Sequence, residues 1–114
     1  MAFKKSFEKL PVGSVDVLAI GCHPDDVEML MGGSILALQK KGISVGIIDL
    51  TDGEPTPYGS PEIRFKECRK ATEIIKPSFR INLGLPNRYL TDSIENRLKL
   101  AGVLRKAKPQ VLFT

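Results

Sequence analysis

Short apolar segments alternate with longer amphipathic segments along most of the chain, and this alternation constrains the fold more than any other feature. Four segments are short, apolar and rich in β-branched residues, which is typical of strands buried in a parallel sheet. Three longer segments between them carry apolar residues at helical spacing. The predicted strands are residues 15–21, 43–50, 79–83 and 110–114, and the predicted helices are residues 28–41, 61–76 and 93–108. This order predicts a parallel sheet with right-handed crossovers.

We therefore expect an α/β, Rossmann-like fold of three layers, whose parallel sheet has the strand order 3-2-1-4. Residues 1–14 are expected to form a polar N-terminal arm, and residues 15–114 to form part of a single α/β domain. Ligands of open α/β sheets bind beyond the carboxyl ends of the strands. Residues 21–27, 51–59 and 84–90 follow the first three predicted strands, so we expect the functional residues there.

The ends and the apolar faces of the helices can also be predicted. Ser60 and Pro61 suit the N-cap and the first position of the second helix. Thr91 or Asp92 is expected to cap the third helix. The residues predicted to face inward in the three helices are Leu30, Met31, Ile35 and Leu38; Phe65, Cys68, Ala71 and Ile75; and Ile94, Leu98, Ala101 and Leu104.

The composition argues against several classes of protein. The chain is 42% hydrophobic, but its longest apolar runs fall well short of the ~20 residues of a membrane span. The net charge of +4 is dispersed and there is no Trp, so a nucleic-acid surface with stacked aromatic side chains is not expected. No signal peptide is predicted, and the two cysteines are expected to be reduced thiols of a cytoplasmic protein. A homo-oligomer is compatible with the sequence.

The turn after the first predicted strand contains the only histidine, His23, followed by Pro24, Asp25 and Asp26. Imidazole nitrogen and carboxylate oxygen are both good zinc ligands, and such a turn can direct residues i and i+3 to one point. One carboxylate would then bind a metal while the other stays free as a base. The structural alternative is a surface histidine followed by an aspartate pair that caps a helix. A metal site is favoured because a nearby cation relieves the repulsion between two adjacent anions.

Five motifs, in this order, resemble the motifs of one known family. They are Gly-Cys-His-Pro-Asp-Asp-Val-Glu from Gly21, Gly-Gly-Ser from Gly32, Leu-Thr-Asp-Gly-Glu from Leu50, Gly-Ser-Pro-Glu-Ile-Arg-Phe-Lys-Glu from Gly59, and Leu-Gly-Leu-Pro-Asn from Leu83. The sequence is similar to the LmbE-like, or PIG-L, family of metal-dependent deacetylases of N-acetylglucosamine-type sugars. The resemblance covers nearly all of the chain after residue 15.

The resemblance implies hydrolysis of an N-acetyl group with release of acetate. The implied cofactor is zinc or another divalent metal, and the implied partner is a small N-acetylated sugar. His23 and Asp26 would be metal ligands, and Asp25 would be the general base that takes a proton from the attacking water. Contacts to the sugar are implied for Glu54, Arg64 and Asp92.

The position of Arg64 agrees with this role on separate grounds. Arg64 lies in the first turns of its predicted helix, where the helix dipole disfavours a cation, and shares a face with Cys68 and Ala71. An inward arginine at the ligand-binding end of a helix indicates a bound polar group. The alternatives are a salt bridge between Arg64 and Glu67, and a solvated loop position for Glu54.

One expected part of the metal site is missing from the chain. Catalytic zinc usually has three protein ligands, and His23 and Asp26 supply two. The resemblance implies that the third is a histidine beyond Thr114. We therefore expect this chain to be the N-terminal portion of an LmbE-like domain that is truncated after the fourth strand, and to be inactive by itself.

Two other functions stay open at this point. One is a non-catalytic, metal-binding or sugar-binding member of the same fold. The other is a nucleotide-binding domain, in which Asp49 would bind a ribose at the end of the second strand. The first turn disfavours nucleotide binding, because two aspartates stand where Gly-x-Gly-x-x-Gly would approach a pyrophosphate.

Overall fold

The computed structural model describes residues 12–114, so most of the expected N-terminal arm lies outside the described residues. Every predicted strand and helix is present, with ends that shift by at most two residues. The elements are β1 (Val17–Gly21), α2 (Asp26–Lys40), β2 (Val45–Thr51), α3 (Pro61–Ile75), β3 (Phe79–Leu85), α4 (Ile94–Ala107) and β4 (Val111–Phe113).

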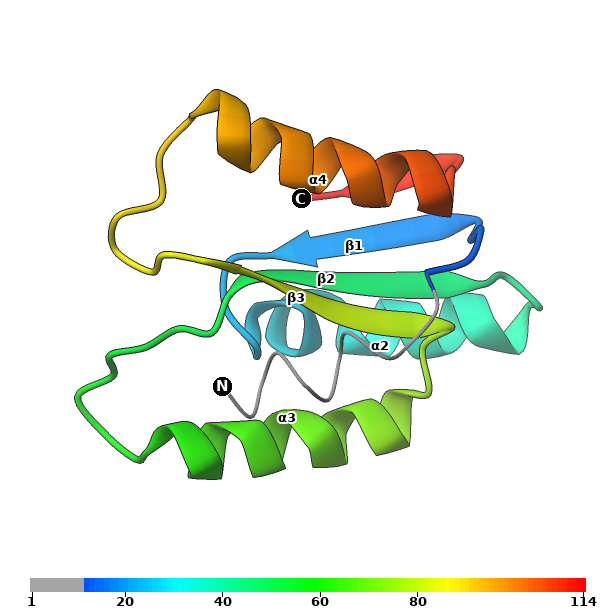
Figure 1. The fold of residues 1–114 in the computed structure, drawn as a ribbon. Helices are drawn as coiled ribbons and strands as arrows, with labels where there is room; N and C mark the ends of the chain where they lie inside the picture. Colours follow the sequence, from blue (N-terminus) through cyan, green and yellow to red (C-terminus); the bar gives the residue numbers. More distant parts are fainter. Residues whose placement is uncertain (1–11) are drawn as a thin grey trace.

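The four strands form one parallel sheet in the order β3-β2-β1-β4, which confirms the predicted class and strand order. Val17 of β1 pairs with Val45 of β2 on one side and with Val111 of β4 on the other. Because all strands point the same way, the loops after β1, β2 and β3 emerge at one end of the sheet (Figure 1). The sheet thus brings together three segments that are distant in the sequence.

Helices cover both faces of the sheet, with α2 and α3 on one face and α4 on the other (Figure 1). Val17 and Ala19 point to the α2 and α3 layer, while Leu18 between them points to α4, as strand alternation requires. The continuous apolar sequence of β1 is therefore explained by burial on both faces.

The predicted caps are correct for α3 and wrong for α4. Ser60 caps α3 by accepting a hydrogen bond from a backbone N–H, and Pro61 holds the first helical position. Ser93, rather than Thr91 or Asp92, caps α4 in the same way. Ser93 is the residue directly before the helix and has the extended backbone that a cap needs, so Asp92 lies one residue too early.

The predicted inward faces of α2 and α4 are partly wrong. Leu30 is 85% exposed, and Ile94 and Leu98 are 75% and 63% exposed. Each residue turns a helix by about 100°, so the face that packs is decided by how the helix lies on the sheet. The residues that face the sheet are Val27, Met31, Ile35 and Leu38 in α2, and Leu100, Val103, Leu104 and Ala107 in α4.

A glycine in β2 makes room for the largest aromatic side chain of the core. A Cβ atom at Gly46 would lie 2.5 Å from the ring of Phe79, which is 1% exposed. Gly46→Ala is therefore expected to lower the free energy of unfolding by about 1–3 kcal/mol, measured by urea denaturation.

The matched control is Gly102→Ala in α4, where no atom lies within 4 Å of an added Cβ. Alanine there is expected to raise the free energy of unfolding by up to about 1 kcal/mol, because it favours the helix. Equal effects of the two substitutions would contradict the role given to Gly46.

Candidate active site

The turn between β1 and α2 places His23, Asp25 and Asp26 at the carboxyl end of the central strand. The Oδ2 atom of Asp26 accepts a hydrogen bond of 2.8 Å from the backbone N–H of His23, which closes the turn. Asp25 holds the N-cap position of α2, but its side chain makes no capping hydrogen bond. The alternative of an aspartate pair that caps the helix is therefore wrong for Asp25, whose carboxylate is left for other contacts.

The side chains of His23 and Asp26 lie close enough that they could hold one cation between them. The Nδ1 atom of His23 lies 3.9 Å from Oδ2 of Asp26, which is too long for a hydrogen bond. Two atoms bound to one tetrahedral zinc at ~2.0–2.2 Å are roughly 3.3–3.6 Å apart, so a small closure would fit them to the metal. Within residues 12–114, no group of three or more His, Cys, Asp or Glu side chains could hold a metal ion. The described residues thus offer at most a pair of candidate ligands, His23 and Asp26.

Asn87 is a member of this site that the sequence analysis did not single out. It lies in the loop after β3, and its Oδ1 atom is 2.8 Å from Nε2 of His23. Its position in the sequence could have identified it, because Asn87 ends the motif that begins at Leu83 and follows the carboxyl end of a predicted strand. The loop after β3 therefore contacts the loop after β1 directly.

Arg64, in the first turns of α3, points to Asp25 rather than to Glu67. Its Nη2 atom lies 3.7 Å from Oδ2 of Asp25, and its side chain is 21% exposed. Gly53, at φ +75°, lets the loop after β2 pass close to the Arg64 side chain. A Cβ atom added at Gly53 would lie 2.9 Å from Nη2 of Arg64. No ion pair joins Arg64 to Glu67 in the part of the chain that the structure describes. The guanidinium thus lies between the first two strand-end loops.

Three buried side-chain atoms among the described residues have no hydrogen-bond partner: Oε1 of Glu28, Oε1 of Glu54 and Nε of Arg64. Oε1 of Glu28 lies 2.9 Å from the Arg80 guanidinium as its ion-pair partner, which leaves the atoms of Glu54 and Arg64. The other carboxylate oxygen of Glu54 accepts a hydrogen bond of 3.1 Å from the backbone of Thr56. Glu54 is therefore not a solvated loop acid. Buried polar atoms are almost always paired in folded proteins, so these two atoms are candidates for hydrogen bonds to a polar ligand.

Asp92 lies apart from these contacts. It is exposed and forms two hydrogen bonds with Arg97 of α4. These bonds hold the pKa of the Asp92 carboxyl below its usual range. No hydrogen bond or ion pair links Asp92 to His23, Asp25 or Arg64 among the described residues. Its predicted contact with a sugar would compete with Arg97.

A buried ion cluster under the site was not predicted. Arg80 of β3 is fully buried and donates hydrogen bonds of 2.8 and 3.0 Å to the Asp49 carboxylate of β2. Its Nη2 atom also lies 2.9 Å from Oε1 of Glu28, in the first turn of α2. Burial raises the pKa of Asp49, and the bonds from Arg80 oppose that rise. The cluster joins two strands to the start of α2, close to Asp26.

This cluster excludes Asp49 as a ribose ligand, because the Asp49 side chain is inaccessible and already bonded to Arg80.

The two cysteines differ in their surroundings. Cys22 is exposed, whereas Cys68 is 2% exposed and burial raises the pKa of its thiol to about 12. Cys68 is thus part of the core, as its helical spacing predicts.

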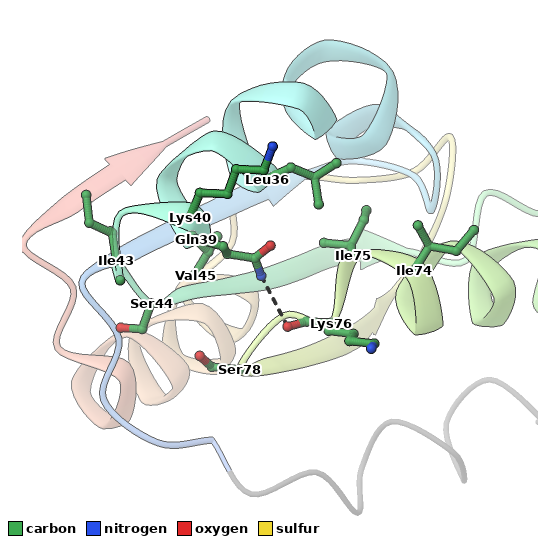
Figure 2. Close-up of a pocket in the computed structure, with 11 residues that line it drawn as sticks. Leu36, Gln39, Lys40, Ile43, Ser44, Val45, Ile74, Ile75, Lys76 and Ser78 are labelled. Atoms are coloured by element: carbon green, nitrogen blue, oxygen red, sulfur yellow. Dashed lines mark hydrogen bonds between the residues drawn. The ribbon is translucent and has the colours of Figure 1, made fainter.

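Two hollows lie at opposite ends of the sheet. One of about 690 Å³ borders Asp26 and is otherwise largely apolar, with Leu30, Leu104 and Phe113 in its lining. The other, of about 680 Å³, lies between the C-terminal ends of α2 and α3, where the Gln39 side chain donates to the Lys76 carbonyl (Figure 2). The lining of the second hollow contains no His, Asp, Glu or Cys. Of these two hollows, the one that borders Asp26 is therefore the candidate for the chemistry.

Comparison with known proteins agrees with this geometry. Residues 18–114, which contain all of these side chains, match the family model "PIG-L: GlcNAc-PI de-N-acetylase". The chain belongs to the PIG-L family. The diacetylchitobiose deacetylase of Thermococcus kodakarensis, a PIG-L relative, is 30% identical over 104 residues, or 85% of this chain and 39% of that protein.

Two solved structures are similar to this chain in both sequence and fold. The conserved protein TT1542 of Thermus thermophilus is 45% identical with a TM-score of 0.81, over 88% of this chain and 46% of that one. The N,N'-diacetylchitobiose deacetylase of Pyrococcus horikoshii is 29% identical with a TM-score of 0.78, over 98% of this chain and 43% of that one. The chain spans less than half the length of these relatives.

No helix within residues 12–114 combines the length and the apolar character that crossing a bilayer requires.

Proposed function

We propose that this PIG-L chain is the N-terminal portion of a metal-dependent deacetylase, which hydrolyses the N-acetyl group of an N-acetylglucosamine-containing substrate and releases acetate. The single observation that carries the proposal is the convergence of His23, Asp25 and Arg64 at one end of the sheet. A pair of proposed cation ligands, a carboxylate that does not cap its helix and a guanidinium lie there, and they are parts that an amide hydrolase needs. The names of the relatives, diacetylchitobiose deacetylase and GlcNAc-PI de-N-acetylase, support this substrate class.

The three side chains of the turn after β1 have distinct roles in the proposed reaction. His23 and Asp26 hold zinc or another divalent cation, which when bound supplies polarisation of the amide carbonyl and acidification of water. Asp25 takes a proton from the attacking water and returns it to the leaving amine. Its carboxylate is suited to this task because it makes no capping bond and is half-exposed next to the positive charge of Arg64.

The sugar is recognised by Glu54 and Arg64, whose buried and unpartnered atoms would bond to its polar groups. Asp92 is proposed as a further contact once Arg97 is displaced. Residues 15–114 would then form one LmbE-like domain together with a segment beyond Thr114 that supplies the third metal ligand. The chain alone is expected to release little or no acetate.

The test is acetate release from diacetylchitobiose, with metal analysis, by the protein at the length of its relatives. Acetate release together with about one bound cation supports the proposal. A bound cation or sugar without acetate release would favour the alternative of a non-catalytic binding protein.

Glu54→Gln is expected to raise the KM for the N-acetylated sugar by roughly 10–100-fold, with a smaller change in kcat. Losing a charged hydrogen-bond acceptor costs about 1.5–3 kcal/mol, and Glu54 has no contact with Asp25 or His23 among the described residues. Steady-state kinetics measure both constants. Glu62→Gln is the control, because Glu62 is exposed at the start of the same helix that carries Arg64. An unchanged KM in Glu54→Gln would remove this residue from the sugar site.

A further inference from the structure

The contact between Asn87 and His23 favours one position for the imidazole proton. The Oδ1 atom of Asn87 is 2.8 Å from Nε2 of His23, in a half-buried position. A carboxamide oxygen can only accept a hydrogen bond, so a hydrogen bond between these two atoms requires the proton of a neutral imidazole on Nε2. The lone pair is then on Nδ1, which lies on the side of Asp26 at 3.9 Å from Oδ2. This is the nitrogen that a cation shared with Asp26 would use.

Two acceptors compete for that single proton. Asp26 is a carboxylate, and a hydrogen bond from Nδ1 to it would be charge-assisted and therefore strong. Such a bond would place the proton on Nδ1 and block that nitrogen as a ligand. Asn87 opposes this outcome because its oxygen is within hydrogen-bond distance, whereas Oδ2 of Asp26 is not.

We propose that Asn87 is a positioning residue, which selects the Nε2–H form of His23 and so presents Nδ1 beside Asp26 for the cation. The tautomer is a property of the chain itself, while its use in binding a cation rests on the proposed function. Asn87 acts through His23, and no hydrogen bond links it to Asp25 or Asp26 among the described residues. Groups that orient a metal-binding histidine typically contribute about 10–100-fold to metal affinity.

The chain allows a direct test, because His23 is its only histidine. With the imidazole labelled with ¹⁵N, two-bond ¹H–¹⁵N correlations at about pH 8, where an ordinary histidine is neutral, read the tautomer without any metal. The unsubstituted chain is expected to show the Nε2–H pattern. An Nδ1–H pattern would overturn the proposal, whatever the variants do.

Variants test the source of the preference. Asn87→Leu keeps the approximate volume but removes the acceptor, so the spectrum is expected to shift towards Nδ1–H and Zn²⁺ affinity, by titration calorimetry, to fall about 10–100-fold. Asn87→Asp keeps an acceptor and is expected to restore both. The control is Gln110→Leu, which removes an exposed carboxamide at the far end of β4. Backbone ¹H–¹⁵N spectra establish that each variant is folded.

An Asn87→Leu chain that keeps the Nε2–H pattern and the Zn²⁺ affinity would show that Asn87 has no positioning role. If the variant does not fold, the tautomer of the unsubstituted chain and the behaviour of Asn87→Asp decide the question. If the tautomer and affinity results hold but the protein at the relatives' length releases no acetate, the proposed function fails while the role of Asn87 stands.

Discussion

Replacing Arg80 with methionine is expected to lower the free energy of unfolding by about 3–5 kcal/mol. The substitution leaves the Asp49 carboxylate buried without its two hydrogen bonds and removes the partner of Glu28. Methionine fills much of the same volume, so the loss reflects the charges rather than a cavity. Urea denaturation followed by circular dichroism measures the change.

The control is Arg69→Met, which breaks an exposed ion pair of 3.1 Å between Arg69 and Glu73 on α3. Exposed pairs of this kind contribute about 0–1 kcal/mol, so little change is expected. If Arg80→Met and Arg69→Met lowered the free energy of unfolding by the same amount, the buried cluster would not stabilise the contact between the sheet and the start of α2.

The loss in Arg80→Met is also expected to depend on pH. Burial already raises the pKa of Asp49, and without the bonds from Arg80 that pKa rises further. In the folded variant, Asp49 therefore keeps its proton over a pH range in which the unfolded chain has already released it. The pKa of an aspartate in an unfolded chain is ~4. The bound proton stabilises the folded variant at low pH, and this stabilisation is lost as the pH rises through the raised pKa of Asp49. The deficit of the variant should thus be smaller at about pH 5 than at about pH 8.

Asp25→Asn is expected to lower kcat by about 10²–10⁴-fold in the protein at the length of its relatives, while the bound cation is retained. The side chain of Asp25 contacts Arg64 and neither caps α2 nor belongs to the ligand pair, so the amide removes a proton acceptor without removing a ligand. Acetate release and metal content measure the two properties separately.

His23→Ala is the companion variant and is expected to lose both properties, because Nδ1 of His23 is half of the proposed ligand pair. Glu73→Gln, an exposed carboxylate in the last turns of α3, serves as the control for acidic residues in general. Full turnover in Asp25→Asn would remove the base assignment, and full metal occupancy in His23→Ala would remove the ligand assignment.

Much of the fold could be predicted because strand and helix patterns are local. The class, the strand order and the placement of His23 at the end of β1 follow from apolar periodicity and from the handedness of crossovers. The outward position of Leu30 and of Leu98 could not be predicted, because a helix with several apolar stripes does not specify which of them meets the sheet. The cap of α4 was missed by one residue for a similar reason, since three neighbouring polar residues could each have served.

The sequence by itself determined which residue types lie at the carboxyl ends of the strands. In a parallel sheet, every loop that follows a strand lies at that same end of the sheet. The tertiary structure alone decided which side chains meet. Asn87 reaches His23 across 64 residues, and Arg80 reaches Asp49 across 31, through the packing of parallel strands. An isolated Arg or Asn carries no local pattern that identifies its partner. Such pairs form only when the sheet brings distant segments within hydrogen-bond distance.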